Sequence, residues 1–129
     1  MRIIDQIRNW YRSKKRGVID AVEDDYKQRL AIAELTHELA AGQLVELPLP
    51  EDGHPWYAGA LRASLAQTPL MFQLNLALTL SSTYHVNIYI EDVRLAETVD
   101  DIASTVLRQI AARDAIVSAA LKRAVRLTV

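Results

Sequence analysis

"LMFQLNLALTLSSTYHVNIYIED", residues 70–92, is the stretch on which the fold depends. From Phe72 to Leu80, large apolar residues alternate with smaller or polar ones, and a second alternation runs from Tyr84 to Ile90. Alternation with a period of two is typical of β-strands that bury one face. The sequence therefore predicts two strands joined as an antiparallel β-hairpin.

The length of the connecting loop decides which residues of the hairpin face each other. A two-residue loop at Ser81-Ser82 would set Leu78 opposite His85 and mix apolar with polar residues. A loop of three or five residues pairs Leu78 with Val86 instead. One face is then apolar, and the other carries Gln73, Asn75, His85, Asn87 and Tyr89.

Helical spacing surrounds the hairpin. Between residues 18 and 41, apolar residues recur at three- and four-residue steps, acidic residues fill the first turns, and Gly42 is placed to end a helix. A second helical pattern starts at Thr98 and loses its apolar spacing near Arg113-Asp114. We expect this helix to bend or restart there, and "VRLTV" at 125–129 is compatible with a strand.

The segment between the first long helix and the hairpin carries weaker signals. Residues 45–49 form an edge strand at most, because Pro48 and Pro50 exclude a central strand. A short helix is expected to start near Pro55 and end before Pro69. The predicted fold class is α+β: a hairpin of two or three strands packed against long helices. All 129 residues would form one domain, with 1–16 as a basic amphipathic helix or arm.

Composition excludes several classes of protein. Half of the residues are hydrophobic and 24% are charged, which is ordinary for a globular domain. There is no cysteine, so disulfides, thiol catalysis and thiolate metal sites are excluded. We find neither a membrane span nor a signal peptide in the pattern and expect a cytoplasmic protein.

The formal net charge of −1 averages three unlike segments. Residues 1–16 carry six Lys/Arg against Asp5, a net charge of +5. Residues 17–101 carry four Lys/Arg against fourteen Asp/Glu, a net of −10, and residues 102–129 carry five against Asp114, a net of +4. Such asymmetry is typical of a binding tail, and it equally allows the basic ends of one subunit to meet the acidic middle of another.

The basic N-terminal segment has one interpretation based on its apolar side. As a helix, it would gather its isoleucines on one side, with aromatic residues next to them. We therefore expect it first to pack in the core or against a second subunit. The partner-binding residues predicted here are Ile3, Ile7, Trp10 and Tyr11.

Two other interpretations of this segment depend on its charge. Its cations suit the phosphates of a nucleic acid, although the pI near 6.3 is far from the basic values of most nucleic-acid-binding domains. The residues predicted for that contact are Arg8, Arg12, Lys14, Lys15 and Arg16. A membrane surface is the third interpretation, because the apolar side is short for stable insertion.

A second aromatic cluster follows an acidic turn. His54, Trp56 and Tyr57 lie around Pro55, and we predict that they bind a partner protein, because Trp and Tyr are enriched at interface hot spots. The alternative is that these aromatic residues cap the core. If the indole is in the interface, Trp56→Ala should weaken a complex without lowering the melting temperature.

Catalytic and metal motifs are incomplete. Glu34 and His37 have the E-x-x-H spacing of di-iron bundles, but no second pair accompanies them, and the four glycines form no phosphate loop. We therefore predict no enzyme, cofactor or metal. An enzyme would need a pocket that sets His85 or His37 beside carboxylates.

The sequence thus favours a small non-enzymatic interaction or assembly protein: an adaptor, chaperone-like factor, inhibitor or structural subunit. Split charge and an exposed edge favour self-association, so the expected partners are a second copy and another protein. The alternative is a nucleic-acid-binding accessory protein that uses its basic N- and C-terminal segments. No small-molecule substrate is indicated.

Overall fold

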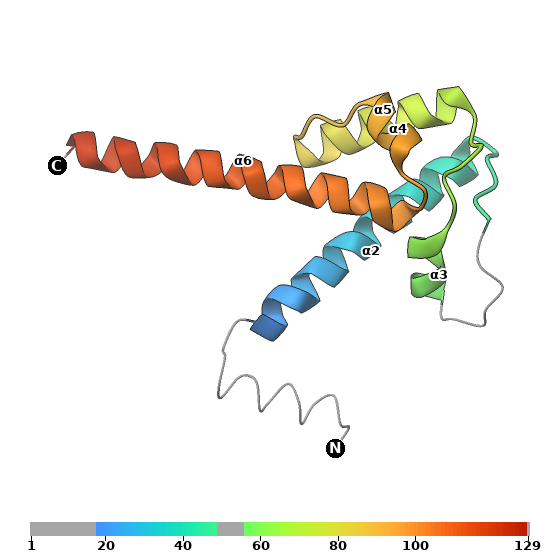
Figure 1. Cartoon of the computed structure of the whole chain (residues 1–129), viewed down its shortest axis with the longest axis horizontal. Helices are drawn as coiled ribbons and strands as arrows, with labels where there is room; N and C mark the ends of the chain where they lie inside the picture. The colour runs from blue at the N-terminus through green and yellow to red at the C-terminus, as the bar shows by residue number, and fades with distance from the viewer. Residues whose placement is uncertain (1–17, 49–55, 129) are drawn as a thin grey trace, which may run out of the picture.

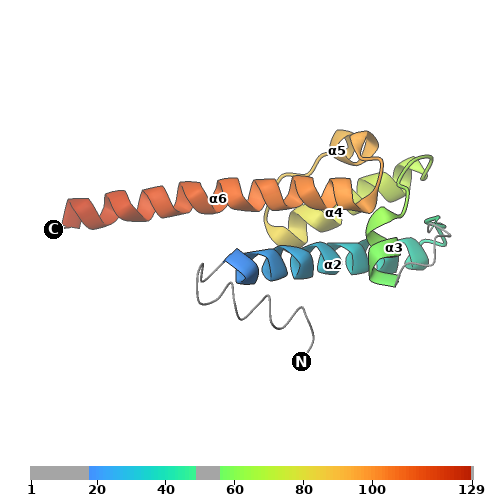
Figure 2. The same cartoon turned by 60° about the horizontal axis from the view of Figure 1, so that its bottom comes forward.

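A computed structural model describes residues 18–48 and 56–128. These residues form α2 (Val18–Gly42), α3 (Trp56–Arg62), α4 (Leu70–Tyr84), α5 (Ile90–Leu95) and α6 (Val99–Thr128). Helices α2 to α5 and the start of α6 gather into a body, and the rest of α6 projects from it (Figure 1). This projection is visible from a second direction in Figure 2.

The described ranges contain no strand, so the predicted α+β fold and its hairpin are wrong. The first predicted strand is α4. In a helix, residues four apart share a face, so strict alternation splits into two series on opposite sides. Phe72, Leu76 and Leu80 form the buried series, whereas Leu70, Leu74 and Leu78 are 63%, 41% and 59% exposed.

Intrinsic propensity explains why this stretch is helical. Its alternating residues are mostly leucine, which favours helices, and Thr79 is the one β-branched residue between 70 and 80. Pro69 precedes the helix with an extended backbone, and His85 ends it in the left-handed conformation at φ 54°. The alternation alone predicted the wrong period.

The second predicted strand is an extended connector followed by α5. Val86 and Ile88 are buried, and Asn87 and Tyr89 are exposed, as alternation requires. The backbone is held by Ser81 rather than by a partner strand. Its hydroxyl accepts from the Ile88 amide at 2.9 Å and donates to the Ile88 carbonyl at 3.0 Å.

The long helices agree more closely with the prediction from the sequence. Helix α2 confirms the prediction for 18–41, and α3 covers the first part of the predicted short helix. Helix α6 runs unbroken through Arg113-Asp114 to Thr128, so the predicted bend and the terminal strand are wrong. No edge strand forms at 45–48, where Leu44 leaves α2 at φ 55° and the Val45 amide bonds back to the Ala40 carbonyl.

The core lies between α2, α4 and the first half of α6, with α3 and α5 closing its ends. Its largest fully buried apolar residues are Ile32, Leu65, Phe72, Leu76, Leu80, Val93, Val99, Ile102 and Val106. One polar bridge fixes α2 to α6. Nη1 of Arg29 lies 2.8 Å from Oδ1 of Asp100 and 2.8 Å from the Ser104 hydroxyl, while Nε lies 2.8 Å from Asp25.

Candidate protein interface on the C-terminal helix

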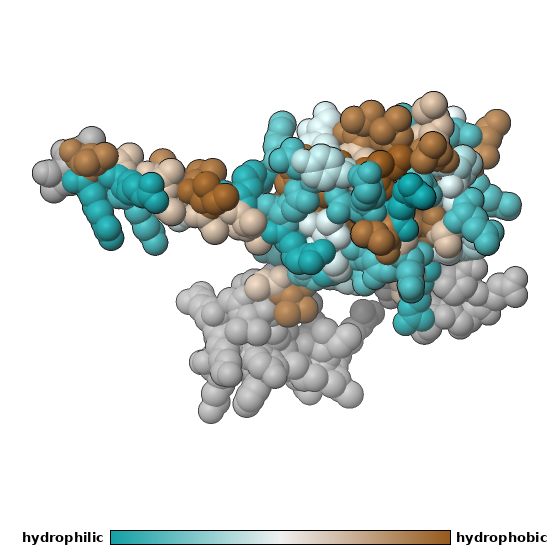
Figure 3. Space-filling view, turned by 45° about the horizontal axis from the view of Figure 1, so that its top comes forward, coloured by the Kyte–Doolittle hydropathy of each residue, from teal (hydrophilic) through white to brown (hydrophobic). Residues whose placement is uncertain are grey.

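Helix α6 consists of two halves with opposite environments. In residues 99–110, here called the body half, Val99, Ile102 and Val106 are fully buried. In residues 111–127, here called the stalk, every side chain is exposed except that of Arg113, which is half-buried. Figure 3 shows the stalk projecting from the body with both apolar and polar side chains on its surface.

The apolar face of the body half continues into the stalk. Val99, Val106 and Ile110 face the core; Arg113 and Asp114 then interrupt the apolar series, which resumes at Val117 with the same four-residue step. We call this continuation the stalk stripe; its residues are Val117, Leu121 and Val125, which are 51%, 62% and 61% exposed. Apolar faces of helices normally face a core, so this one fits a contact with another molecule.

The stalk is also basic. Arg113, Lys122, Arg123 and Arg126 stand against Asp114, which gives residues 111–127 a net charge of +3. Lys122 and Arg126 follow Leu121 and Val125 directly along the helix, so they border the stripe. The stalk therefore combines an apolar stripe with positive charge.

The base of the stalk is attached to the end of α4. Arg113 donates to the Tyr84 carbonyl, and the side-chain oxygen of Gln109 accepts from the Asn87 amide at 2.9 Å. A hollow of about 310 Å³ lies here, lined in part by His85, Ile116 and Val117. Its lining includes no carboxylate, so His85 has no acid–base partner in this hollow.

Helix α2 has a similar extension at its N-terminal end. Val22 and Tyr26 continue the series of buried positions that includes Ala33, Thr36 and Ala40, yet they are 63% and 40% exposed. Residues 18–28, here called the acidic half of α2, carry four Asp/Glu against Lys27, a net charge of −3. In Figure 1 this half diverges from the stalk beyond the point where the two helices meet.

The outer series of α4 is another exposed apolar surface. Leu70, Met71, Leu74 and Leu78 are each at least 41% exposed, and α4 contains no charged residue. Brown side chains also gather at the upper edge of the body in Figure 3. This surface offers no charge that would select a partner, which distinguishes it from the stalk.

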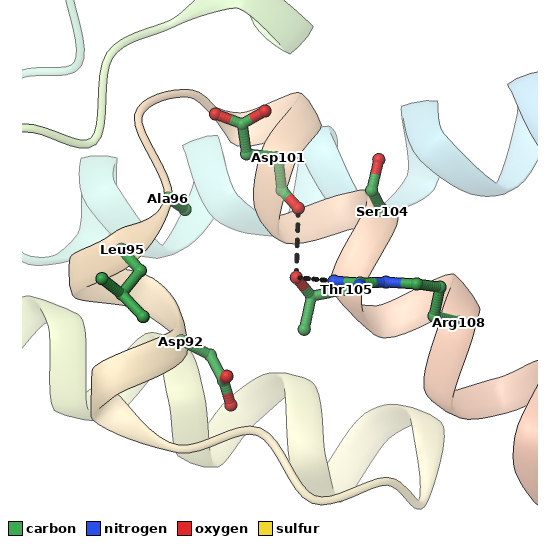
Figure 4. A pocket seen from close by; sticks show the side chains of 7 residues that line it. All are labelled: Asp92, Leu95, Ala96, Asp101, Ser104, Thr105 and Arg108. Carbon is green, nitrogen blue, oxygen red and sulfur yellow. Dashed lines mark hydrogen bonds between the residues drawn. The ribbon is translucent and has the colours of Figure 1, made fainter.

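A pocket of about 350 Å³ lies between α5 and the start of α6 (Figure 4). Its two carboxylates cap helices: Asp92 accepts from the Tyr89 amide, and Asp101 accepts from the amides of Glu97 and Thr98. Arg108 donates to the Thr105 hydroxyl. Because its acidic groups already cap helices and its lining has no His, Cys or Lys, the pocket is a poor candidate for catalysis.

His37 lies at a contact between helices. Its Nε2 is 3.2 Å from the Ala60 carbonyl oxygen, so α2 and α3 meet through this ring. Within 18–48 and 56–128, no three His, Asp or Glu side chains are placed to hold a metal ion. The E-x-x-H pair of Glu34 and His37 therefore finds no further metal ligand in that part of the chain. The two residues do line, with Glu38 and Ala41, a surface hollow of about 530 Å³ that sets His37 beside carboxylates.

The predicted binding residues are largely outside the described ranges. This applies to Ile3, Ile7, Trp10 and Tyr11, to the cations Arg8, Arg12, Lys14, Lys15 and Arg16, and to His54. Trp56 and Tyr57 open α3, where only their backbone is described. Sequence reasoning missed the stalk because a helical apolar pattern looks the same whether it is buried or exposed.

Comparison with known proteins provides no relative. No protein-family model, curated protein or solved structure matches the chain. Among the helices described, none has both the length and the apolar character needed to cross a membrane.

Proposed function

We propose that the protein is a small non-enzymatic assembly protein that associates with itself through the stalk. The observation that carries this proposal is the exposure of Val117, Leu121 and Val125 on a helix whose other half is buried. A subunit of this kind could serve as an adaptor or structural component, and we place it in the cytoplasm because it lacks cysteine.

Energetics support a partner for the stalk. Fully burying a Val or Leu side chain contributes roughly 1.5–3 kcal/mol to stability. Burial of the half-exposed stalk stripe against a second molecule would therefore stabilise that contact by several kcal/mol. In proteins, most helical stability comes from the packing of an amphipathic face, and the stalk stripe is at least half exposed. A second molecule on the stripe would supply that packing.

The alternative is a nucleic-acid-binding accessory protein. Lys122, Arg123 and Arg126 lie within five residues of one another on an exposed helix, which is the observation that favours it. Phosphate contacts weaken steeply with salt. Retention of the full chain on nucleic acid that decreases strongly with added salt would support this function, and no retention at low salt would exclude it.

Light scattering of the full chain tests self-association directly. We expect the wild-type mass to exceed that of one chain, and Leu121→Asp to return it to that of one chain, because a carboxylate would then be buried in the interface. Ala119→Asp is the matched control, since residue 119 is exposed and lies on the face opposite Val117 and Leu121. A wild-type protein that has the mass of one chain at every concentration would exclude the proposed function.

A further inference from the structure

We infer that two copies of the chain pair through antiparallel stalks, with Leu121 of one copy against Leu121 of the other. This pairing rests on the self-association proposed above and names the surface that the stalk stripe meets. In this register Val117 of each copy lies against Val125 of the other. A two-fold axis through the pair of leucines then relates the two chains, so both make the same contact.

The stalk stripe lies on the side of α6 that faces the core within the body. Eighteen residues make five turns of an α-helix, so residues 18 apart point in the same direction. The stripe therefore points the same way as Val99, Ala103 and Leu107, which belong to the core that α2 and α4 also line. A parallel partner on the stripe would have to continue into the space that α2 and α4 occupy.

An antiparallel partner avoids this collision. It runs along the stripe in the opposite direction, so the two bodies lie at opposite ends of the paired stalks. The outer part of the stalk projects beyond the other described helices in both Figure 1 and Figure 2. A second stalk can therefore reach the stripe without displacing the body to which the stripe belongs.

The stripe is also symmetrical about its central residue. Leu121 lies four residues after Val117 and four residues before Val125. A contact about a two-fold axis requires such a self-complementary surface, because each residue that meets a second one is met by it in return. Antiparallel pairing about Leu121 thus places each valine opposite a valine, and no apolar residue of the stripe opposite a charged one.

The hollow at the base of the stalk fits the same register. Its lining includes Val86, Ile116 and Val117, and its volume is about 310 Å³. Val125 of the second copy lies opposite Val117, so its side chain reaches the edge of this hollow. Val125 is 61% exposed in one chain, and the hollow offers it an apolar surface to cover.

Charge is unevenly distributed along the stalk. Lys122, Arg123 and Arg126 lie in its outer part, whereas residues 115–121 carry no charge. Antiparallel pairing sets the basic part of each stalk against the uncharged part of the other. Parallel pairing would instead align three cations with three, and like charges side by side repel each other. The distribution therefore favours the antiparallel direction for two stalks of the same charge.

The contact is small, which determines how tightly the copies associate. Two helix faces about 25 Å long and about 10 Å wide cover less than the roughly 1,200 Å² at which standard interfaces begin. Interfaces below that size are typical of transient association. We therefore expect a weak dimer, whose population rises steadily with protein concentration.

Cysteine cross-linking of full-length variants tests the direction of the pair. The chain contains no cysteine, so Val117→Cys and Val125→Cys each introduce one thiol at an exposed position. The two variants are mixed at high concentration and oxidised, and peptide mass spectrometry identifies the disulfides. Because a disulfide requires Cα atoms within about 7 Å, we expect the 117–125 disulfide to exceed the 117–117 and 125–125 disulfides at least about five-fold.

Two further variants measure association itself. Leu121→Cys should form a 121–121 disulfide in high yield, because the two-fold axis brings these positions together. Ala119→Cys is the matched control, since residue 119 is exposed and lies on the face opposite the stripe. The yield of the 119–119 disulfide gives the level of chance collisions.

The outcomes separate this inference from the proposed function. Abundant 117–117 and 125–125 disulfides, in excess of the 117–125 disulfide, would overturn the inference alone, because the stalks would then pair in parallel. Disulfides at 117, 121 and 125 that all stay at the level of the 119 control would overturn both, because no contact between stalks would then form.

Discussion

The two halves of α6 have the same helical apolar spacing and opposite surroundings. Ile102 and Val106 are fully buried in the body half, whereas Val117 and Leu121 are at least half exposed in the stalk. The spacing determines which face of a helix is apolar, and the rest of the chain determines whether that face is covered. The stalk is a face that the described part of the chain leaves exposed.

Alanine substitutions at matched apolar positions in the two halves of α6 should give the largest difference in the free energy of unfolding. Ile102→Ala removes a fully buried side chain and should lower the free energy of unfolding by about 2–5 kcal/mol. Leu121→Ala should change the unfolding of the monomer by less than about 0.5 kcal/mol, because the side chain is exposed. Urea unfolding at low protein concentration measures both. Equal losses would mean that the stalk is part of the core of a single chain.

The two apolar series of α4 provide a similar comparison. Leu76→Ala should cost about 2–5 kcal/mol, and Leu78→Ala less than about 0.5 kcal/mol, because Leu76 is buried and Leu78 is 59% exposed. In the hairpin that alternation predicts, both residues would share the apolar face and lose similar amounts. Urea unfolding of the two variants therefore tests the helix against the hairpin.

The bridge that joins α2 to α6 should have a smaller effect. Arg29→Met keeps much of the aliphatic stem and removes the contacts with Asp100 and Ser104, and we expect a loss of about 1 kcal/mol, since the carboxylate is half exposed. Arg108→Met removes an exposed arginine with one hydrogen bond and is the control, with a loss below about 0.5 kcal/mol. Equal losses would contradict a structural role for the bridge.

The smallest expected effect concerns pH. Burial raises the pKa of Tyr84 above its ordinary value of 10.0, because the phenolate is poorly solvated. The folded state therefore favours the neutral phenol; this stability is present below pH 10 and is lost as pH rises through the raised pKa. Tyr84→Phe should reduce the fall in melting temperature above about pH 10 by a few degrees at most. An unchanged alkaline fall would contradict this contribution.

Part of the fold follows from the sequence. Periodic apolar residues together with Gly42 predicted α2, and the spacing after Thr98 predicted α6. Leu70 to Leu80 misled the interpretation because period two also describes a helix that is apolar on two opposite sides. The leucine content and the near absence of β-branched residues both indicated a helix. The prediction gave more weight to the alternation and was therefore wrong.

The candidate site was less accessible to sequence reasoning. Val117, Leu121 and Val125 fit the helical pattern, but their exposure depends on where α2 and α4 end relative to α6. That depends on tertiary packing and not on local pattern. The opposite charges of the chain's segments were visible in the sequence, and they already allowed basic ends of one subunit to meet the acidic middle of another.

Hydrogen exchange of the full chain, measured at several protein concentrations, tests the central claim most directly. We expect backbone amides of the stalk, residues 111–127, to become more protected as concentration rises, because association covers and stabilises that helix. Amides of the body half at 99–110 should be well protected at the lowest concentration as well. Stalk amides that exchange rapidly at every concentration, or whose protection does not change with concentration, would contradict self-association through the stalk.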